Sequence, residues 1–361
     1  MRTILLLSTL CLVSLAQGPQ PSSGLVGGPY VIETGQRTAT VMWVTAGGSA
    51  SVGTTPEANE KTAPSLHVQK VSFAGLQPGK TYYYDVQQGA AGKGSFKAAP
   101  TAGQPFRFIV YGDTRTRYDV HRTVINAILR EETPDFVLHT GDMVENGGQT
   151  DLWPIFFDIE RELLRKTTLF PSFGNHERND QQFYDLFDMR LPYYSFDWGN
   201  AHFAVMDSDL ANLRDTAAKE TQWTAQMRWH EEDLAGSQKA AYRFVAAHHP
   251  PMSAVPERQN ANQEMKALMP MFEKYKLTAG LFGHDHNYQH YLKNGVHYII
   301  SGGGGAPLYE VDKPPEGITQ KVIKIENFVV FSLNGAKIHV EAKGVDGAVL
   351  DSFDLNQSPA P

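Results

Sequence analysis

Five short clusters of metal-binding side chains recur along the chain, each directly after an apolar run that is typical of a strand. They are Gly112-Asp113-Thr114-Arg115, Gly141-Asp142, Gly174-Asn175-His176-Glu177, His248-His249-Pro250 and Gly283-His284-Asp285-His286. Carboxylate, amide and imidazole groups bind divalent or trivalent ions, and two neighbouring ions can activate water for hydrolysis. In open α/β sheets, ligands collect at the carboxyl ends of the strands. The series therefore predicts a site for two metal ions at one edge of a sheet.

The last cluster shows the spacing most clearly. His284 and His286 lie two positions apart, so in an extended chain they point to the same side. The preceding Gly283 lets the backbone turn sharply and approach an ion closely. Since the chain contains 13 histidines, two polar loop residues are the alternative for this pair taken alone. The four upstream clusters favour metal binding.

Beyond Pro105, the elements that must position these clusters alternate between strand and helix. Apolar runs predict strands at 106–111, 136–138, 169–173, 203–206, 244–247, 279–282 and 298–300. Helical periodicity predicts helices at 120–129, 153–164, 222–234 and 264–275. This alternation is typical of an α/β layered domain. Near the C-terminus, Asn334-Gly335 and Asp346-Gly347 predict hairpin turns.

Residues 25–100 read as strands throughout and predict a separate all-β domain. The stretch from Leu76 to Tyr84 resembles the tyrosine corner of a fibronectin type III or immunoglobulin-like sandwich, in which a Tyr hydroxyl ties a loop to the backbone. Trp43 would be the core Trp of that sandwich. Residues 98–105, small side chains with Pro and Gly, mark the boundary to a catalytic domain at 105–361.

Met1 to Ala16 is typical of a secretory signal peptide, because a basic Arg2 precedes an apolar stretch and a small-residue cleavage pattern. About twelve apolar positions are too few to span a bilayer. The single cysteine, Cys11, lies in this segment, so the mature chain would have no disulfide. We expect a periplasmic or secreted protein with a flexible leader at 17–24; a buried N-terminal element is the alternative.

Composition and charge narrow the classes of partner. Hydrophobic residues make up 41% and charged residues 20%, as in soluble globular proteins. A length of 361 residues suggests two domains, or one large domain with an appendage. The formal charge of −7, without a basic block, disfavours nucleic acid or an anionic membrane as the main partner.

The order Gly-Asp, Gly-Asp, Gly-Asn-His-Glu, His-x-Pro and Gly-His-x-His resembles the calcineurin-like metallophosphoesterase superfamily. With the strands in front, the chain looks like its purple acid phosphatase-like branch. The segment Tyr194 to Asn200 and the glycine run Gly302 to Gly305 add to the resemblance. It implies an α/β fold of two mixed β-sheets packed as a sandwich and flanked by helices, preceded by the all-β sandwich, with a dimetal centre between the two sheets.

The resemblance also implies a role for each matching residue. The first metal would be bound by Asp113 and His286, the second by Asn175, His248 and His284, with Asp142 bridging both. The family's ligand stands two residues before Pro250, so His248 is preferred to His249, which would orient the site. His176 would lie beside the phosphate and help the leaving group depart. Alternatively, Asp113 and Asp142 could be turn residues at the ends of strands.

Two positions depart from the family pattern. Purple members have a Tyr ligand three residues after the bridging Asp, where this chain has Glu145; other members have Asp-x-His where it has Asp113-Thr114-Arg115. Glu145 or water could replace the missing ligand of the first metal. Arg115 could point its guanidinium at the substrate phosphate, because a planar fork suits oxyanions, or pair with a nearby carboxylate.

The histidines outside the clusters are expected to have lesser roles. His139 and His202 fall in or next to predicted strands, which favours core or supporting roles. His290 follows the last cluster closely enough to reach a substrate.

The function implied is hydrolysis of a small phosphorylated substrate without a covalent enzyme intermediate. Two ions (Fe, Mn or Zn) would lower the pKa of bound water from about 15.7 towards 7, and the resulting hydroxide would attack phosphorus in line. We expect a phosphatase acting on phosphomonoesters. A phosphodiesterase with the same centre is the alternative. A surface protein with a vestigial metal site is disfavoured by the intact ligand set.

Overall fold

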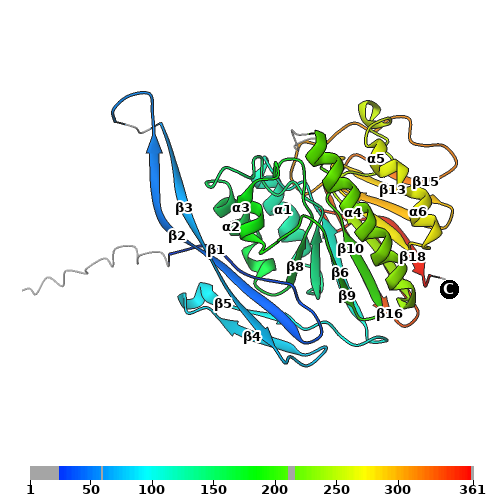
Figure 1. Ribbon diagram of the computed structural model, residues 1–361, viewed down its shortest axis with the longest axis horizontal. Coiled ribbons are helices and arrows are strands. Elements are labelled where there is room, and N and C mark those ends of the chain that lie inside the picture. Colours follow the sequence, from blue (N-terminus) through cyan, green and yellow to red (C-terminus); the bar gives the residue numbers. More distant parts are fainter. Residues whose placement is uncertain (1–23, 58–59, 210–215, 359–361) are drawn as a thin grey trace, which may run out of the picture.

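The computed structural model describes residues 24–57, 60–209 and 216–358. The expected signal peptide, Cys11 and all but the last residue of the expected leader therefore lie outside the described residues. Two β-sheets pack face to face at the centre of the molecule, and helices cover both outer faces (Figure 1). Among the helices described, none is both long and apolar enough to cross a membrane.

The larger sheet has nine strands in the order β18-β17-β16-β6-β7-β8-β1-β2-β3. Its central strands run parallel and are β6 (Phe106–Tyr111), β7 (Phe136–His139) and β8 (Thr168–Pro171). On one side follow the antiparallel strands β16 (Asn327–Asn334), β17 (Lys337–Gly344) and β18 (Val349–Asn356). On the other side lie β1 (Leu25–Ile32), β2 (Thr38–Val52) and β3 (Lys61–Ala74). Hairpins form at both predicted C-terminal turns.

The smaller sheet has seven strands in the order β15-β13-β14-β12-β11-β10-β9. Its parallel strands are β10 (Ala201–Val205), β11 (Tyr242–Ala247), β12 (Ala279–Phe282) and β14 (Val296–Ser301). The antiparallel strands are β9 (Tyr194–Trp198), β13 (Tyr288–Lys293) and β15 (Thr319–Ile323). The strands predicted at 106–111 and 279–282 are confirmed to the residue.

Helices on each outer face bury their apolar sides against the adjacent sheet. The nine-stranded sheet is covered by α1 (Tyr118–Ile128), α2 (Trp153–Leu164) and α3 (Gln181–Leu186). The seven-stranded sheet is covered by α4 (Thr216–Gly236), α5 (Gln263–Ala267) and α6 (Met269–Lys274). Short 3-10 turns are η1 (Gly89–Gly92), η2 (Ser237–Lys239) and η3 (Pro256–Arg258). The single helix predicted at 264–275 is broken in two, because Pro270 lacks the N–H that would continue the ladder.

Stacked aromatic rings hold the two sheets together. Phe108 of β6 stacks on Phe136 at 4.8 Å and on Phe331 at 4.4 Å within its own sheet. It meets Phe203 and Phe244 of the other sheet edge-on, at 5.3 and 5.7 Å between ring centroids. Burying one such side chain stabilises the fold by about 1.5–3 kcal/mol. This core fixes how the parallel strands of the two sheets face each other, and all five clusters follow the ends of such strands.

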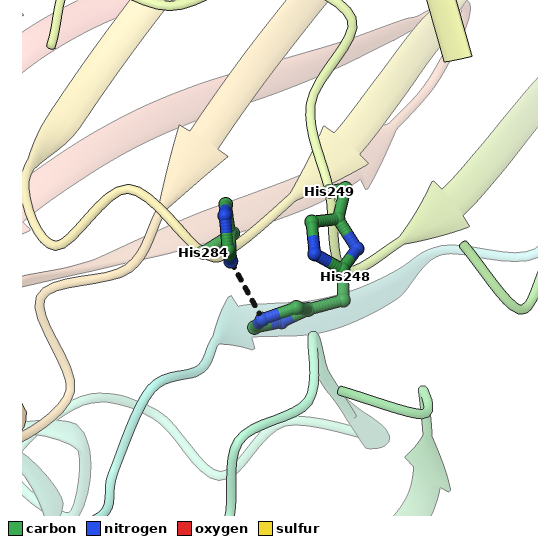
Figure 2. Close-up of side chains that lie close together, drawn as sticks. All are labelled: His248, His249 and His284. Atoms are coloured by element: carbon green, nitrogen blue, oxygen red, sulfur yellow. Dashed lines mark hydrogen bonds between the residues drawn. The ribbon is translucent and has the colours of Figure 1, made fainter. Parts of the chain in front are cut away.

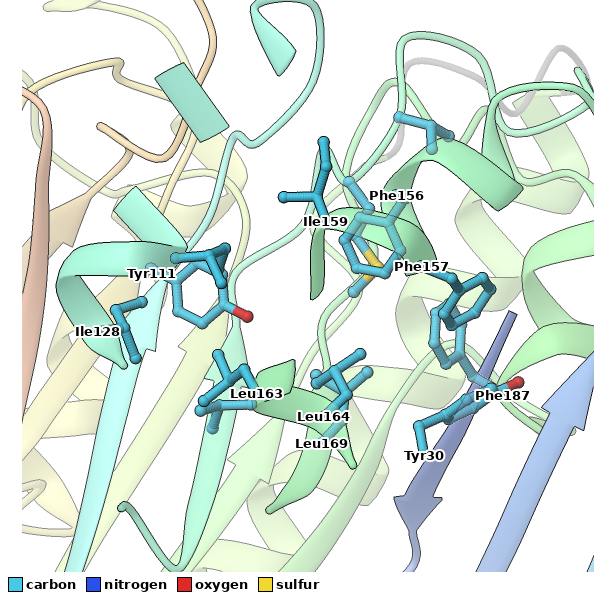
Figure 3. Close-up of a cluster of buried hydrophobic side chains, with 14 of the residues drawn as sticks. Tyr30, Tyr111, Ile128, Phe156, Phe157, Ile159, Leu163, Leu164, Leu169 and Phe187 are labelled. Atoms are coloured by element: carbon cyan, nitrogen blue, oxygen red, sulfur yellow. The ribbon is translucent and has the colours of Figure 1, made fainter. Parts of the chain in front are cut away.

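The N-terminal strands do not form the separate sandwich expected for residues 25–100. Strand β1 pairs with β8 through Val31 and Thr168, so β1–β3 extend the nine-stranded sheet. Tyr30 stacks on Phe157 of α2 at 4.8 Å, within a core that the N-terminal strands share with α2 and the central strands of the larger sheet (Figure 3). Only β4 (Thr81–Asp85) and β5 (Lys93–Lys97) form a second layer, a two-stranded sheet packed on β1 and β2.

Two details of the expected N-terminal domain can be followed in this small layer. The backbone N–H of Gln77 donates to the Tyr82 hydroxyl at 2.8 Å, which is the hydrogen bond that a tyrosine corner requires. Trp43, in contrast, is only partly buried and belongs to none of the described core clusters. The buried core between these layers contains smaller side chains, among them Val41 and Phe96.

His202 lies between two carboxylates on the smaller sheet. Its Nδ1 is 2.8 Å from Asp197 Oδ1, and its Nε2 is 2.7 Å from Asp233 Oδ2. Burial lowers the pKa of His202, but the two hydrogen-bonded carboxylates outweigh burial and raise this pKa to about 9. The unfolded-state pKa is about 6.5. These contacts therefore stabilise the fold fully below about pH 6.5, and the contribution is lost as the pH rises to about 9.

Replacing His202 by Gln should lower the free energy of unfolding by about 2 kcal/mol near pH 6 and by much less near pH 9.5. The expected loss of unfolding free energy is smaller than the pKa shift alone would give, because the Asp197 side chain is 76% exposed and solvent screens its charge. Denaturant unfolding of both proteins at the two pH values measures the difference. His339→Gln, which removes an exposed imidazole beside Asp354, is the control. If His202→Gln lowers the free energy of unfolding equally at both pH values, the raised pKa of His202 does not contribute to stability.

Candidate metal centre

Three of the predicted ligands stand in the left-handed region of backbone conformation. The φ angles are 59° at Asp113, 56° at Asp142 and 67° at His284. This region is uncommon for residues other than glycine and persists only where the surroundings enforce it. At Gly141, with φ of 94°, an added Cβ would lie 2.8 Å from the Gly174 backbone and 2.9 Å from His248 Nδ1. The ligand loops therefore touch, and glycine is required between them.

Three electron-pair donors converge where the second metal was expected. Asn175 Oδ1 lies 3.1 Å from both His248 Nε2 and His284 Nδ1, and the two ring nitrogens are 3.2 Å apart. His248 and His284 come from the ends of β11 and β12 and face each other with His249 beside them (Figure 2). Three facing donors are stable only with a proton or cation between them, and their spacing suits ligands about 2 Å from one ion.

Hydrogen bonds on the far side of two rings leave the near nitrogens free to bind. His248 Nδ1 donates to the Thr140 carbonyl at 2.8 Å, and His286 Nδ1 donates to the Pro307 carbonyl at 2.7 Å. Each Nε2 therefore carries the lone pair in the neutral ring. A hydrogen bond of this kind fixes the tautomer and orientation of metal-binding histidines.

Asp113 offers the clearest sign that the first site fits a cation. Its Oδ1 is buried and has no hydrogen-bond partner among the described residues, and it lies 3.3 Å from His286 Nε2. Its Oδ2 accepts the backbone N–H of His284 at 2.9 Å. An unpartnered buried carboxylate oxygen is costly. A metal ion shared with His286 would satisfy it.

Asp142 connects the two groups of donors. A carboxylate oxygen of Asp142 lies within 4.8 Å of a carboxylate oxygen of Asp113 and of a ring nitrogen of His286. Its Oδ1 is also 3.4 Å from His248 Nε2, and it accepts the backbone N–H of His176 at 2.9 Å. All six predicted ligands thus come together, and the donor set fits two neighbouring ions.

Charges around the site keep Asp142 ionised. Burial raises the pKa of this carboxyl group, but His248, His176 and Arg115 outweigh burial and lower the pKa below its ordinary value. A bridging carboxylate must be ionised to bind two cations. The surroundings of Asp142 therefore favour that role.

The imidazoles of the second group differ in protonation. Burial and the neighbouring rings lower the pKa of His284 and of His249 well below the ordinary value, so both rings are neutral at pH 7. Burial also lowers the pKa of His248, but Asp142 and Asp113 outweigh it and raise that pKa. A metal ion at His248 Nε2 would displace the proton held there.

Arg115 makes the carboxylate contacts that were the alternative to a phosphate contact. Its Nη1 lies 2.6 Å from Glu145 Oε2, and its Nε lies 3.3 Å from Asp142 Oδ2. Nη2 has no hydrogen-bond partner among the described residues. Glu145 is held by Arg115 and Thr116 and is not part of either described group of converging ligands.

His176 and His249 flank the ligands. His176 Nδ1 donates to the Glu145 carbonyl at 2.9 Å, which leaves Nε2 3.9 Å from Asp142 Oδ2. His249 Nδ1 is 3.0 Å from the Ser208 hydroxyl, and a ring nitrogen of His249 lies within 4.8 Å of the donor atoms of His248 and His284. Both rings therefore lie where they could contact a substrate bound at the ions.

Glu177 supports the site, although the sequence did not indicate its role. Its fully buried carboxylate accepts backbone N–H groups from Asp142 at 2.9 Å, Met143 at 2.8 Å and Gly174 at 2.8 Å. It therefore ties the Asp142 loop to the Asn175 loop. Its place next to His176 in the third cluster was the only signal in the sequence.

His290 does not reach the site, contrary to the expectation from its position. It is 3% exposed; its Nδ1 lies 2.8 Å from Asp351 Oδ2 and its Nε2 lies 2.9 Å from His297 Nδ1. Both ring nitrogens are engaged, because β13 directs this side chain towards β18.

Known proteins resemble the chain in sequence and in fold. Rabbit (Oryctolagus cuniculus) tartrate-resistant acid phosphatase type 5 is 43% identical over 81 residues, which cover 22% of this chain and 24% of that protein. The chain thus spans about a quarter of that relative. The probable inactive purple acid phosphatase 1 of Arabidopsis thaliana is 24% identical over 329 residues, covering 73% of this chain and 52% of that protein.

The fold is shared with a solved structure, purple acid phosphatase PPD1 from yellow lupin (Lupinus luteus) seeds. The TM-score is 0.72 at 18% identity, over 91% of this chain and 74% of that chain. Residues 106–288, more than half of the chain, match the family model for calcineurin-like phosphoesterases. The match includes all six converging donors. The chain belongs to the calcineurin-like phosphoesterase family.

Proposed function

We propose that the protein is an exported dimetal phosphoesterase that hydrolyses phosphate monoesters. The observation that carries the proposal is the position of Asp142 between two groups of converging donors, one of which contains a buried Asp113 oxygen without a hydrogen-bond partner among the described residues. In this proposal Asp113 and His286 would hold the first ion, Asn175, His248 and His284 would hold the second, and Asp142 would contribute to both. The proposed ions are Fe, Mn or Zn.

Bound ions of this kind polarise phosphoryl oxygens and activate water at neutral pH. The surrounding residues prepare the site for an anionic substrate. Asn175 supplies an uncharged oxygen among the ligands, which limits the negative charge that would repel a phosphate. Arg115 adds a cation, and its free Nη2 could donate to a phosphate oxygen.

His176 is the proposed proton donor to the leaving group. Because Nδ1 is committed to the Glu145 carbonyl, Nε2 is the atom that would hold and deliver the proton. The hydrogen bond also fixes the ring plane, so the proton would be delivered from one direction. The neutral ring of His249, fixed by Ser208, is the proposed second contact to substrate oxygens.

Export is proposed from the N-terminal sequence alone, where a basic end, an apolar stretch and a small-residue cleavage pattern follow one another. The proposed substrate is a small phosphorylated molecule. A phosphodiesterase is the alternative, because the same donors could serve a diester. A vestigial site would not be expected to retain all six donors in converging positions.

Hydrolysis of a chromogenic phosphomonoester and of the matching diester, with Zn²⁺, Mn²⁺ or Fe supplied, tests this proposal. Faster turnover of the monoester by at least about tenfold in kcat/KM would support it. A preference for the diester would select the alternative. No hydrolysis of either compound by protein that binds two ions would point to a vestigial centre.

Replacing Arg115 by Ala should weaken inhibition by free phosphate while leaving the metal content nearly unchanged. Loss of one charge-assisted contact costs about 1.5–3 kcal/mol, which is about ten- to a hundredfold in kcat/KM. Arg115→Lys should recover only part of this loss, because an ammonium group cannot form the paired fork. The inhibition constant for phosphate and the melting temperature of each variant are the measurements.

If phosphate inhibition stays unchanged in both variants, Arg115 stabilises its loop and does not contact the substrate. In that case its contacts with Glu145 and Asp142 hold the loop, so both variants would melt at lower temperature with unchanged phosphate inhibition. Arg122→Ala is a matched control, since this arginine also pairs with a carboxylate, Asp158, but on the exposed surface of α1.

A further inference from the structure

Arg258, at the end of η3, contacts the loop that carries one proposed ligand of each ion. Its Nη1 donates to the backbone carbonyl of His284 and lies 3.0 Å from Asp285 Oδ1. Its guanidinium carbon lies 4.4 Å from the ring centroid of Tyr309. One side chain thus joins η3, the loop from Gly283 to His286 and the segment that follows β14.

The partner of Arg258 is a carboxylate enclosed between the two ligand histidines. Asp285 is fully buried, and its side chain accepts hydrogen bonds from Ser253, Gln289 and Arg258. Arg258 is the only cation among these partners. A buried carboxylate without a paired charge is strongly unfavourable, so Arg258 stabilises the loop in this conformation.

Tyr309 acts on the same loop from its other end. Its ring stacks on His286 with centroids 4.1 Å apart and planes 13° apart, and its backbone N–H donates to the His286 carbonyl at 3.1 Å. The neighbouring Pro307 carbonyl accepts the His286 Nδ1–H. This segment therefore sets the orientation of His286, and in the part of the chain that the structure describes it makes no hydrogen bond or ring contact to His284.

We propose that Arg258 is a positioning residue for both metal ions. By holding the His284 carbonyl and the Asp285 carboxylate, it fixes the backbone from which His284 reaches the second ion and His286 the first. Tyr309 lies against Arg258 as well, but the proposed ligand that its ring contacts directly is His286. The inference rests on the proposed dimetal centre, and it predicts that two residues outside the ligand set affect the ions differently, one acting on both and the other on one.

The test is metal binding to the full-length protein, measured by titrating metal-depleted chain with Zn²⁺ in a calorimeter. Arg258→Ala should weaken both binding steps by about ten- to a hundredfold, the range found when residues that orient metal ligands are lost. Arg258→Lys should recover part, since an ammonium can pair with Asp285 but lacks the planar fork that also reaches the carbonyl and stacks on Tyr309.

The tyrosine gives a second, independent comparison. Tyr309→Ala removes the stacked ring and should weaken one binding step more than the other. Tyr309→Phe keeps the ring and should bind both ions like the wild type. Equal weakening of both steps by Tyr309→Ala would contradict its assignment to His286 alone.

Control variants separate the loss of ligand positioning from a loss of folding. Arg228→Ala removes an arginine that pairs with Glu232 at 3.0 Å on the exposed side of α4, and both affinities should stay unchanged. The melting temperature of each metal-free variant shows whether it is folded. If Arg258→Ala does not fold, Arg258→Lys decides: partial weakening of both steps supports the proposal, and wild-type affinities overturn it.

Failure of the proposed dimetal centre can be distinguished from failure of the positioning role of Arg258. A wild-type chain that binds fewer than two ions overturns the proposed dimetal centre and this inference with it. A wild-type chain that binds two ions, with unchanged affinities in folded Arg258→Ala, overturns the positioning role alone.

Discussion

Replacing Asp142 by Asn should remove at least one of the two ions and lower the rate of phosphomonoester hydrolysis by at least about a hundredfold. Losing a residue that merely orients a ligand costs about 10–100-fold, and a bridging ligand should cost at least the upper end of this range. The new amide would also place N–H donors near Arg115 Nε, which now lies 3.3 Å from Asp142 Oδ2. Metal content and turnover of the purified variant are the measurements.

The substitution keeps side-chain size, so loss of activity would not be due to a cavity. Asp158→Asn makes the same chemical change at an exposed helix position, where Asp158 pairs with Arg122, and should leave metal content and turnover unaltered. If Asp142→Asn retained two ions and the wild-type rate, the bridging role and the assignment of the centre would both be wrong.

Glu177→Ala should lower the free energy of unfolding by about 3–5 kcal/mol and should also reduce metal binding. The change leaves three buried N–H groups, those of Asp142, Met143 and Gly174, without an acceptor, and each such group costs about 1–3 kcal/mol. Because the contribution of a network is not additive, the expected total lies below the largest sum. Denaturant unfolding and metal titration measure the two effects.

Glu162→Ala serves as the comparison for Glu177, because this α2 side chain is 52% exposed and pairs with Arg165 at 3.5 Å. Its replacement should change the free energy of unfolding by no more than about 0.5 kcal/mol. A cost for Glu177→Ala as small as that for Glu162→Ala would show that water replaces the carboxylate and that the two ligand loops do not depend on it.

Local patterns in the sequence were sufficient for the elements that surround the site. Helix 153–164 and strand 106–111 were predicted to the residue, because continuous apolar runs and helical periodicity are properties of short windows. The candidate ligands could be located for a related reason. Each follows a strand directly, and strand ends converge at one edge whatever the lengths of the connections.

The organisation of the N-terminal strands could not be predicted in the same way. Whether β1–β3 form their own sandwich or extend a neighbouring sheet depends on one pairing, Val31 with Thr168, between residues far apart in the chain. Strand propensity in residues 25–100 is compatible with both outcomes. The shared core of Tyr30 and Phe157 is likewise a long-range contact without a local pattern.

Supporting residues of the site were missed for a related physical reason. Glu177 stands within a recognisable cluster, but its three backbone partners are visible only in the folded chain. Arg258 and Tyr309 carry no local signal, since their contacts join segments more than twenty residues apart. His290 shows the reverse case, because closeness in sequence to His286 did not place it beside the candidate ligands.

The most direct test of the dimetal assignment is the rate of phosphomonoester hydrolysis measured against the number of metal ions bound per chain. Metal-depleted protein is reloaded in steps, and bound metal is determined by elemental analysis of each sample. The assignment predicts little hydrolysis until the second ion binds and full activity at two ions per chain. Hydrolysis by metal-free protein, or full activity with one ion bound, would contradict it.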